Sequence, residues 1–290
     1  MSHFIQDTIA IVYDFDGTLT PQPMQEYTVL PKIGMSAKRF WKEVDEEVVC
    51  EAADPMLTYM RLMVEKLEQA RQHLNPRDLC ALAPRIDYFP GVEDWFGRIN
   101  EYVREHSRDE VNIEHYIISA GLREILEGTR IRDNFRRIYA SEYFFNHHEV
   151  ATFPKVVIND TNKTQYLFRI NKGREEISES INEYMPEAER RIPFANMLYI
   201  GDGLTDVPCM TVTKKNGGFA IAVHKPRNNK TIGVCRKLLR ADRVDYYAPA
   251  DYRPDSLLDR RVRLILDLII ARIQLARETF ECRRGLGSGD

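Results

Sequence analysis

Polar residues that could do chemistry directly follow apolar segments at four places along the chain. These residues are Asp14 and Asp16 in IVYDFDGTLTP (residues 11–21), Ser119 after HYII, Lys172 after YLFRI, and Asp202 and Asp206 in GDGLTD after MLYI. Two neighbouring carboxylates repel each other unless a cation, a proton or hydrogen-bond donors compensate them. A simple polar turn could explain the first pair alone, because Asp and Gly are ordinary turn residues. A turn does not explain why polar residues follow apolar segments at four places.

These residue types suit phosphoryl transfer, which needs a nucleophile, positive charge and hydrogen-bond donors around the phosphoryl oxygens. The first two aspartates would supply a nucleophile and an acid/base, Ser119 a hydroxyl donor and Lys172 a cation. The last two aspartates add hard oxygen ligands. A set of oxygen ligands without clustered His or Cys favours Mg²⁺ over Zn²⁺.

Alternating strands and helices must position these side chains. Residues 9–13 form a continuous apolar run, typical of a buried parallel strand, and further strands are predicted at 115–118, 164–173 (TQYLFRINKG), 197–200 and 217–226. This alternation predicts an α/β fold with a doubly wound parallel sheet. Ligands bind at the carboxyl ends of the strands in that architecture, and each polar motif is predicted to lie at such an end.

Residues 22–106 differ in character from the rest of the chain. They are rich in Glu, Lys, Arg, Leu and Met, with apolar residues at helical spacing in PMLTYMRLMVEKLEQARQHL. We therefore expect a mostly helical cap domain at 22–106, inserted after the first strand, and a core domain made of residues 1–21 and 107–290. The stretch DRRVRLILDLIIARIQLARETF predicts a long helix that packs on the core, and a homodimer contact is its alternative role.

The composition of the chain argues against several kinds of partner and cellular location. The 41 Lys and Arg residues are dispersed among 44 Asp and Glu residues, which argues against a nucleic-acid partner. The five cysteines lack the paired spacing of zinc sites or disulfide frameworks, so a cytoplasmic location is expected. The N-terminus lacks the features of a secretory signal, and LILDLIIA is interrupted by Asp267, so no membrane association is expected.

The motifs DFDGTLT, IISAG, NKG and GDGLTD, in this order, resemble those of the haloacid dehalogenase (HAD) superfamily. Their form is similar to the phosphatase branch that includes phosphoserine phosphatases, and the resemblance covers residues 9–223. It implies a HAD-like Rossmannoid core and a phospho-aspartyl mechanism. Asp14 would attack phosphorus, and Asp16 would protonate the leaving oxygen and later activate water. Ser119 and Lys172 would bind the phosphate.

The resemblance also implies a Mg²⁺ cofactor. Its ligands would be the carboxylate of Asp14, the main-chain carbonyl of Asp16 and the carboxylate of Asp202, with Asp206 supporting the metal or its waters. Lys163 is the alternative to Lys172 as the third-motif lysine. We prefer Lys172 because it would lie at the end of a strand, whereas Lys163 precedes that strand in a polar turn.

The predicted function is hydrolysis of a small phosphorylated metabolite by a phosphatase. Asp16 argues against a dehalogenase, which lacks this second aspartate, and against a transport ATPase, which has Thr there. A phosphomutase and a non-catalytic phosphometabolite-binding protein are the alternatives. Ser119 could also merely cap a following helix. Pro23 stands where phosphoserine phosphatases place a substrate-reading glutamate, which disfavours phosphoserine as the substrate.

Overall fold

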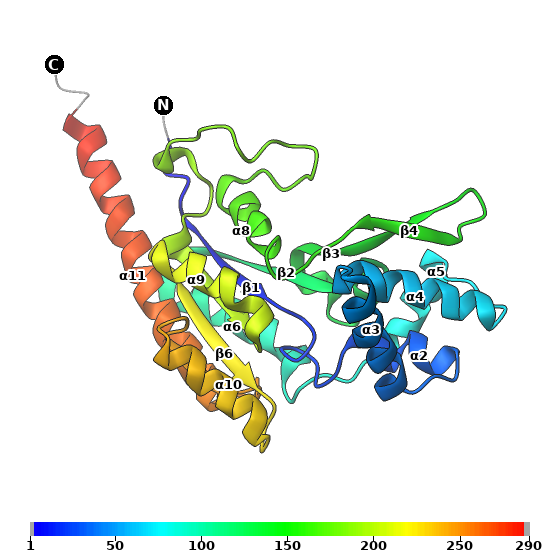
Figure 1. Ribbon diagram of the computed structural model, residues 1–290. Coiled ribbons are helices and arrows are strands. Elements are labelled where there is room, and N and C mark those ends of the chain that lie inside the picture. Colours follow the sequence, from blue (N-terminus) through cyan, green and yellow to red (C-terminus); the bar gives the residue numbers. More distant parts are fainter. Residues whose placement is uncertain (1–2, 287–290) are drawn as a thin grey trace.

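A seven-stranded sheet forms the centre of the protein, whose computed structural model describes residues 3–286 (Figure 1). The strand order is β4-β3-β2-β1-β5-β6-β7, and every neighbouring pair is parallel except β3 and β4. The bounds are β1 (Thr8–Tyr13), β2 (Asn112–Leu122), β3 (Phe135–Phe145), β4 (Ala151–Val156), β5 (Met197–Gly201), β6 (Phe219–His224) and β7 (Tyr246–Pro249). Because β2 and β5 flank β1, the strand order reverses beside β1, which places a crevice at its carboxyl end.

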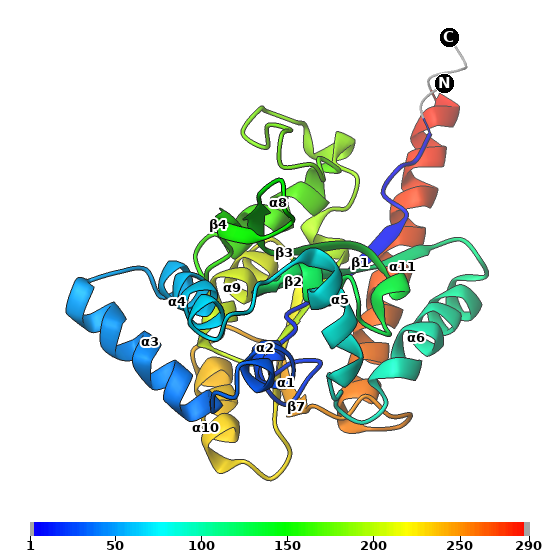
Figure 2. The same cartoon turned by 90° about the vertical axis from the view of Figure 1, so that its right-hand side faces the viewer.

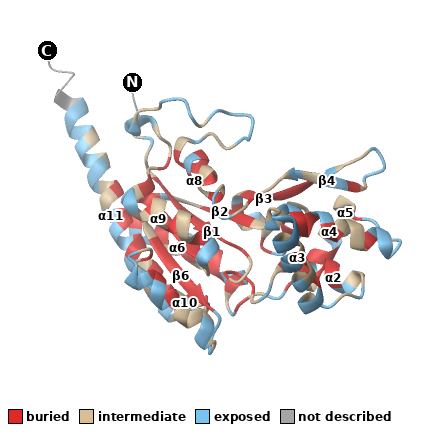
Figure 3. Cartoon of the chain, viewed as in Figure 1, coloured by how far each residue is buried: buried red, intermediate tan, exposed pale blue. Residues whose placement is uncertain are grey.

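The central strand β1 is buried on both faces of the sheet. Ile9, Ile11 and Tyr13 belong to one apolar cluster, whereas Ala10 and Val12 belong to the other. The first face is covered by α6 (Val92–Ser107) and α11 (Leu257–Leu286), and the second by α8 (Lys163–Lys172), α9 (Val207–Lys215) and α10 (Asn229–Arg240). Figure 3 shows the buried strands between these helices, as a continuous apolar run requires.

Five helices between β1 and α6 form a group beyond one end of the sheet, at the right in Figure 1, and Figure 2 views the molecule from that side. They are α1 (Met24–Tyr27), α2 (Val29–Lys32), α3 (Ala37–Glu51), α4 (Pro55–Gln69) and α5 (Pro76–Leu82). The antiparallel pair β3–β4 reaches toward this group: α4 packs against β4, and the Tyr143 hydroxyl donates a hydrogen bond of 2.8 Å to the Met60 carbonyl. The β3–β4 hairpin therefore supports the helical group from the sheet side.

The two chain segments that enter and leave this helical group lie next to each other. The amide of Phe89 donates a hydrogen bond of 2.9 Å to the carbonyl of Leu19. Beyond that point, α6 packs against β2 and α11. The expected cap range of 22–106 includes α6, and we propose that the boundary between the domains instead lies near Phe89.

Four of the five predicted strands are confirmed as β1, β2, β5 and β6, and the predicted long C-terminal helix is α11, which buries Val262, Leu266 and Ile269. The strand predicted at 164–173 is wrong, because this segment is helix α8. Its buried residues Tyr166, Leu167 and Ile170 follow helical spacing and pack on one face. Strands β3, β4 and β7 were not predicted from the sequence.

No helix in the described part of the chain has a stretch long and apolar enough to cross a membrane. The five cysteines, which all lie among the described residues, are unpaired.

Candidate active site

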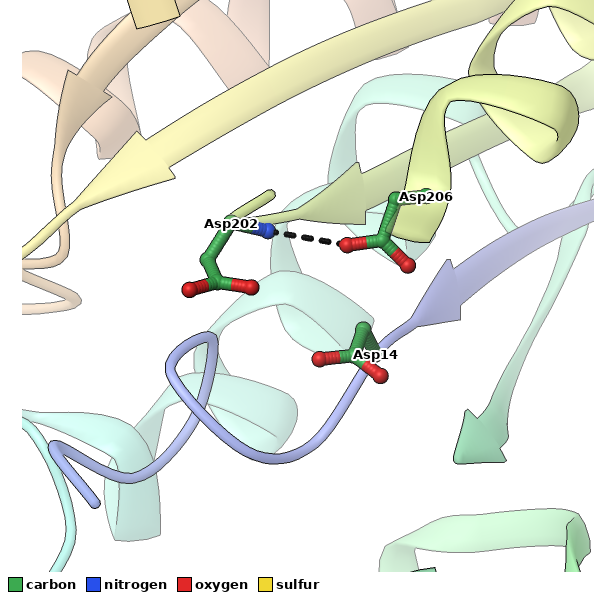
Figure 4. A group of neighbouring side chains, drawn as sticks. All are labelled: Asp14, Asp202 and Asp206. Carbon is green, nitrogen blue, oxygen red and sulfur yellow. Dashed lines mark hydrogen bonds between the residues drawn. The ribbon is translucent and has the colours of Figure 1, made fainter. Parts of the chain in front are cut away.

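Three aspartates meet at the carboxyl ends of β1 and β5 (Figure 4). Asp14 directly follows β1, and Asp202 and Asp206 follow β5. Each of the three offers a carboxylate oxygen, and these oxygens all lie within 4.8 Å of one another. These three residues therefore lie close together, as their predicted positions at strand ends require.

The loop after β1 needs glycine at position 17. Gly17 has a φ of +83°, in the left-handed region, and a Cβ there would lie 2.2 Å from Oδ2 of Asp202. Its amide donates a hydrogen bond of 2.8 Å to the Thr20 carbonyl and closes the turn. The conformation that glycine permits thus lets the β1 loop approach the β5 loop.

Lys163 is the cation that lies among these aspartates. Its Nζ donates hydrogen bonds of 2.7 Å to Oδ1 of Asp14 and 2.8 Å to Oδ1 of Asp206, and its side chain is 2% exposed. Burial opposes the charge on this ammonium, but the two aspartates outweigh it and raise the pKa of Lys163. Lys163 therefore stays protonated.

The predicted position of Lys172 in the site is wrong. Its Nζ donates to the carbonyls of Ile181 and Glu183, at 2.6 Å each. Lys172 was misplaced because a strand was predicted at 164–173. In helix α8, Lys163 and Lys172 occupy opposite ends, about 13 Å apart along the axis at 1.5 Å per residue. Only the first residue of α8 reaches the aspartates.

Asp206 is held on both of its carboxylate oxygens. Besides Lys163, the Tyr199 hydroxyl donates to Oδ1 at 2.8 Å, and the amide of Asp202 donates to Oδ2 at 3.1 Å. By contrast, the Asp202 carboxylate accepts no hydrogen bond among the described residues and is half-buried. Asp202 is thus free to bind a ligand, whereas Asp206 fixes the loop and the lysine.

Negative charge in this group exceeds positive charge. Burial raises the pKa of Asp14 to about 6, although Lys163 acts in the opposite direction. Burial, and then the charge of Asp14, raise the pKa of Asp202 to about 8. Lys163 alone therefore leaves part of the carboxylate charge uncompensated. Clustered carboxylate oxygens with uncompensated charge suit a hard divalent cation such as Mg²⁺.

The Asp16 carboxylate is not part of the cluster formed by Asp14, Asp202 and Asp206, and it lies where helix α1 begins. Its Oδ1 accepts a hydrogen bond of 2.8 Å from the amide of Met24, the first residue of α1. Burial, and then the charge of Asp14, raise the pKa of Asp16 to about 8. The carboxyl group can therefore hold a proton near neutral pH and release it readily, as a general acid and base must.

Ser119 is buried within β2, and its Oγ accepts a hydrogen bond of 3.0 Å from the amide of Gly121. The next helix, α7 (Arg123–Leu126), has Leu122 as its N-cap, so Ser119 does not cap it. Because the hydroxyl oxygen already serves as an acceptor, its proton is available to a ligand.

These side chains line one cavity of about 280 Å³. Four of its lining residues were candidates from the sequence: Asp14, Asp16, Ser119 and Lys163. The other lining residues are Asp54, Pro55, Met56, Ala120, Asn159, Asp160 and Thr205. Asp54, its neighbours in α4 and the loop between β4 and α8 were not predicted as parts of the site. Asp-Pro at 54–55 is a helix-start signal, but it says nothing of where the helix lies in space.

The sequence pattern of haloacid dehalogenase-like hydrolases matches residues 11–211, a segment that contains all of these motifs. The chain belongs to this family. It is 27% identical over 277 residues to an uncharacterized protein of Borreliella burgdorferi, and the match covers 87% of this chain and 94% of that one.

Two solved structures share the fold of this family member. A HAD family hydrolase from Salmonella enterica serovar Typhi superposes with a TM-score of 0.58 at 16% identity, covering 90% of this chain and 72% of that chain. A phosphoserine phosphatase with an analogue of the phospho-aspartyl intermediate superposes with a TM-score of 0.53 at 15% identity. The match covers 89% of this chain and 99% of that chain. The predicted doubly wound α/β fold of a HAD-like core is thereby confirmed.

Proposed function

We propose that this protein is a Mg²⁺-dependent phosphatase that hydrolyses a small phosphomonoester through a phospho-aspartyl intermediate on Asp14. The observation that carries the proposal is the orientation of Asp14 in the cavity. Lys163 donates to its Oδ1 at 2.7 Å and Thr18 Oγ1 to its Oδ2 at 3.3 Å, while Asp16 and Ser119 line the same cavity. A nucleophile, an acid/base and phosphate-binding donors thus share one small space.

In the first step, a carboxylate oxygen of Asp14 forms a bond to phosphorus as the bond to the leaving oxygen breaks. That leaving oxygen takes the proton held by Asp16, whose raised pKa suits this role. Lys163 and the Ser119 hydroxyl would stabilise the charge on the transferred phosphoryl oxygens. The products of this step are an alcohol and phosphorylated Asp14.

In the second step, Asp16 takes a proton from water, and the resulting hydroxide oxygen attacks phosphorus. Inorganic phosphate leaves and the carboxylate of Asp14 is restored. Asp14, Asp202 and the main-chain carbonyl of Asp16 would hold Mg²⁺, and Asp206 would support it through the Asp202 loop. When bound, the ion supplies positive charge to the phosphoryl oxygens.

The test is release of inorganic phosphate from p-nitrophenyl phosphate by purified protein with Mg²⁺. In ¹⁸O-labelled water the released phosphate should carry the label, because water attacks phosphorus. Isomerisation of a sugar phosphate without phosphate release would instead identify a phosphomutase. Binding of phosphorylated metabolites without any turnover would identify a non-catalytic binding protein.

We also propose a cytoplasmic location, which the five unpaired cysteines support. A homodimer through α11 stays a prediction, supported by the exposed side chains of Leu264, Leu268 and Leu275 on that helix.

A further inference from the structure

We propose that the substrate's leaving group carries an ammonium group, as in an amino-alcohol phosphate, and that Asp54 is the residue that recognises it. This inference rests on the proposed phosphatase function. It concerns the part of the cavity that is lined by residues 54–56, at the start of α4, and by Asp160.

The charges that line the cavity argue against an anionic leaving group. Among the described residues, Lys163 is the single cationic residue of the lining, and its ammonium is already bound by Asp14 and Asp206. No arginine of residues 3–286 lines the cavity, so a carboxylate on the leaving group would find no free cationic partner from this part of the chain. A carboxylate that enters such a site without a counter-charge is strongly disfavoured.

Two further carboxylates line the same cavity. Asp54 comes from the cap and is half-buried, whereas Asp160 comes from the loop before α8 and is exposed. Neither forms an ion pair within the described part of the chain. A cationic group bound between them would gain two attractive interactions, and an anionic group would meet two repulsive ones.

Asp54 is held rigidly enough to act as a recognition residue. It is the N-cap of α4, and its Oδ1 accepts hydrogen bonds from the amides of Met56, at 2.8 Å, and Leu57, at 3.0 Å. Its Oδ2 accepts no hydrogen bond among the described residues. One oxygen therefore fixes the carboxylate, and the other is available to a donor such as an ammonium group.

The remaining lining fits a short carbon chain. Pro55, Met56 and Ala120 supply apolar surface beside Asp54. The volume of about 280 Å³ is at the small end of the range for ligand pockets, roughly 300–1,000 Å³, and it must also hold the phosphate. A leaving group of a few carbon atoms that ends in an amine matches both the size and the charge.

The test compares three phosphomonoesters with two carbons each: O-phosphoethanolamine, ethyl phosphate and phosphoglycolate, which are cationic, neutral and anionic at the far end. With the Mg²⁺-loaded wild-type protein we expect kcat/KM, from phosphate release, to fall in that order, by about tenfold or more per step. Equal rates, or a preference for phosphoglycolate, would overturn the inference while leaving the phosphatase intact. No phosphate from any of them or from p-nitrophenyl phosphate would overturn both.

The variant Asp54→Asn assigns the preference to a residue. Asn caps a helix as well as Asp does, so α4 should remain folded, and circular dichroism checks this. We expect kcat/KM for O-phosphoethanolamine to fall about tenfold and that for ethyl phosphate to stay within about twofold. Each comparison is between the variant and the wild type with the same substrate, so differences in intrinsic reactivity between the substrates do not affect it. Asp160→Asn is the matched control: if it removes the preference and Asp54→Asn does not, the assignment to Asp54 is wrong.

Discussion

Lys163→Met should damage both the stability and the activity of the protein, whereas Lys172→Met should affect neither strongly. The two lysines begin and end the same helix, α8, and the substitution keeps an unbranched side chain, one atom shorter, while it removes the charge. Lys163 is buried between Asp14 and Asp206, whereas Lys172 donates to two main-chain carbonyls. This contrast makes the pair a matched experiment.

The size of the stability effect follows from the charges that remain. Removing one partner of a buried ion pair leaves an uncompensated charge and typically lowers the free energy of unfolding by about 3–5 kcal/mol. At about 2 °C per kcal/mol for a chain of this size, Tm should fall by about 6–10 °C. Lys172 donates two hydrogen bonds, one part-buried and one exposed, and losing both should lower the free energy of unfolding by only about 1–2 kcal/mol.

The effect on activity follows from the position of the ammonium beside the nucleophile. Removing a charged donor that stabilises transferring oxygens typically lowers kcat by about 10²–10³-fold. We expect this loss for Lys163→Met and a change within about twofold for Lys172→Met. Tm is measured by thermal unfolding in excess chelator, and kcat is measured from phosphate release with Mg²⁺.

The double variant Lys163→Met/Asp206→Asn tests the electrostatic explanation itself. If the stability loss arises from an unpaired buried carboxylate, removing the charge of Asp206 should recover part of it. No recovery would mean that Lys163 acts through packing. Equal effects of Lys163→Met and Lys172→Met would refute the assignment of Lys163 to the site.

Three further outcomes are expected. Asp14→Asn should abolish turnover without unfolding the protein, since the side chains are nearly isosteric, and activity within about tenfold of wild type would contradict the mechanism. Chelation should remove activity and Mg²⁺ should restore it better than Ca²⁺, which accepts looser coordination; full activity in excess EDTA would refute this. Because the pKa of Asp202 is raised to about 8, the folded metal-free protein holds a proton that the unfolded chain releases near pH 4, so stability falls as pH rises between these values. Asp202→Asn should therefore stabilise the metal-free protein more at about pH 8 than at about pH 5 by urea unfolding, and an equal effect at both would contradict the explanation.

Most of the site could be predicted because its residues directly follow strands. Asp14 and Asp202 come straight after buried apolar runs, and parallel neighbours bring the carboxyl ends of their strands together. Lys163 follows no such rule, since it reaches the aspartates from the start of a helix whose docking on the sheet depends on tertiary packing. Asp54 could not be predicted as a site residue. The periodicity of a helix indicates which of its faces is buried, but not where the helix lies relative to the sheet.

The fold was predictable where strands are buried on both faces and was missed where they are not. β3 and β4 carry charged and exposed residues such as Arg136 and Lys155, so they lack the continuous apolar run of β1. They also pair antiparallel at the edge of the sheet, and α4 covers one side. The error at 164–173 had another cause: three consecutive apolar or aromatic residues, Tyr166–Phe168, hid the helical spacing of the buried ones.

The balance of charge around Asp14 implies that metal and substrate must bind cooperatively under the proposed function. The carboxylates of Asp14, Asp16, Asp202 and Asp206 lie together with the ammonium of Lys163, and a phosphomonoester dianion would add to the excess of negative charge. The proton on Asp16 removes one of these charges, because its pKa is raised to about 8. A divalent cation offsets the two negative charges that then remain on these residues, so the bound cation strengthens the binding of the dianion, and by linkage the dianion strengthens the binding of the cation by the same factor.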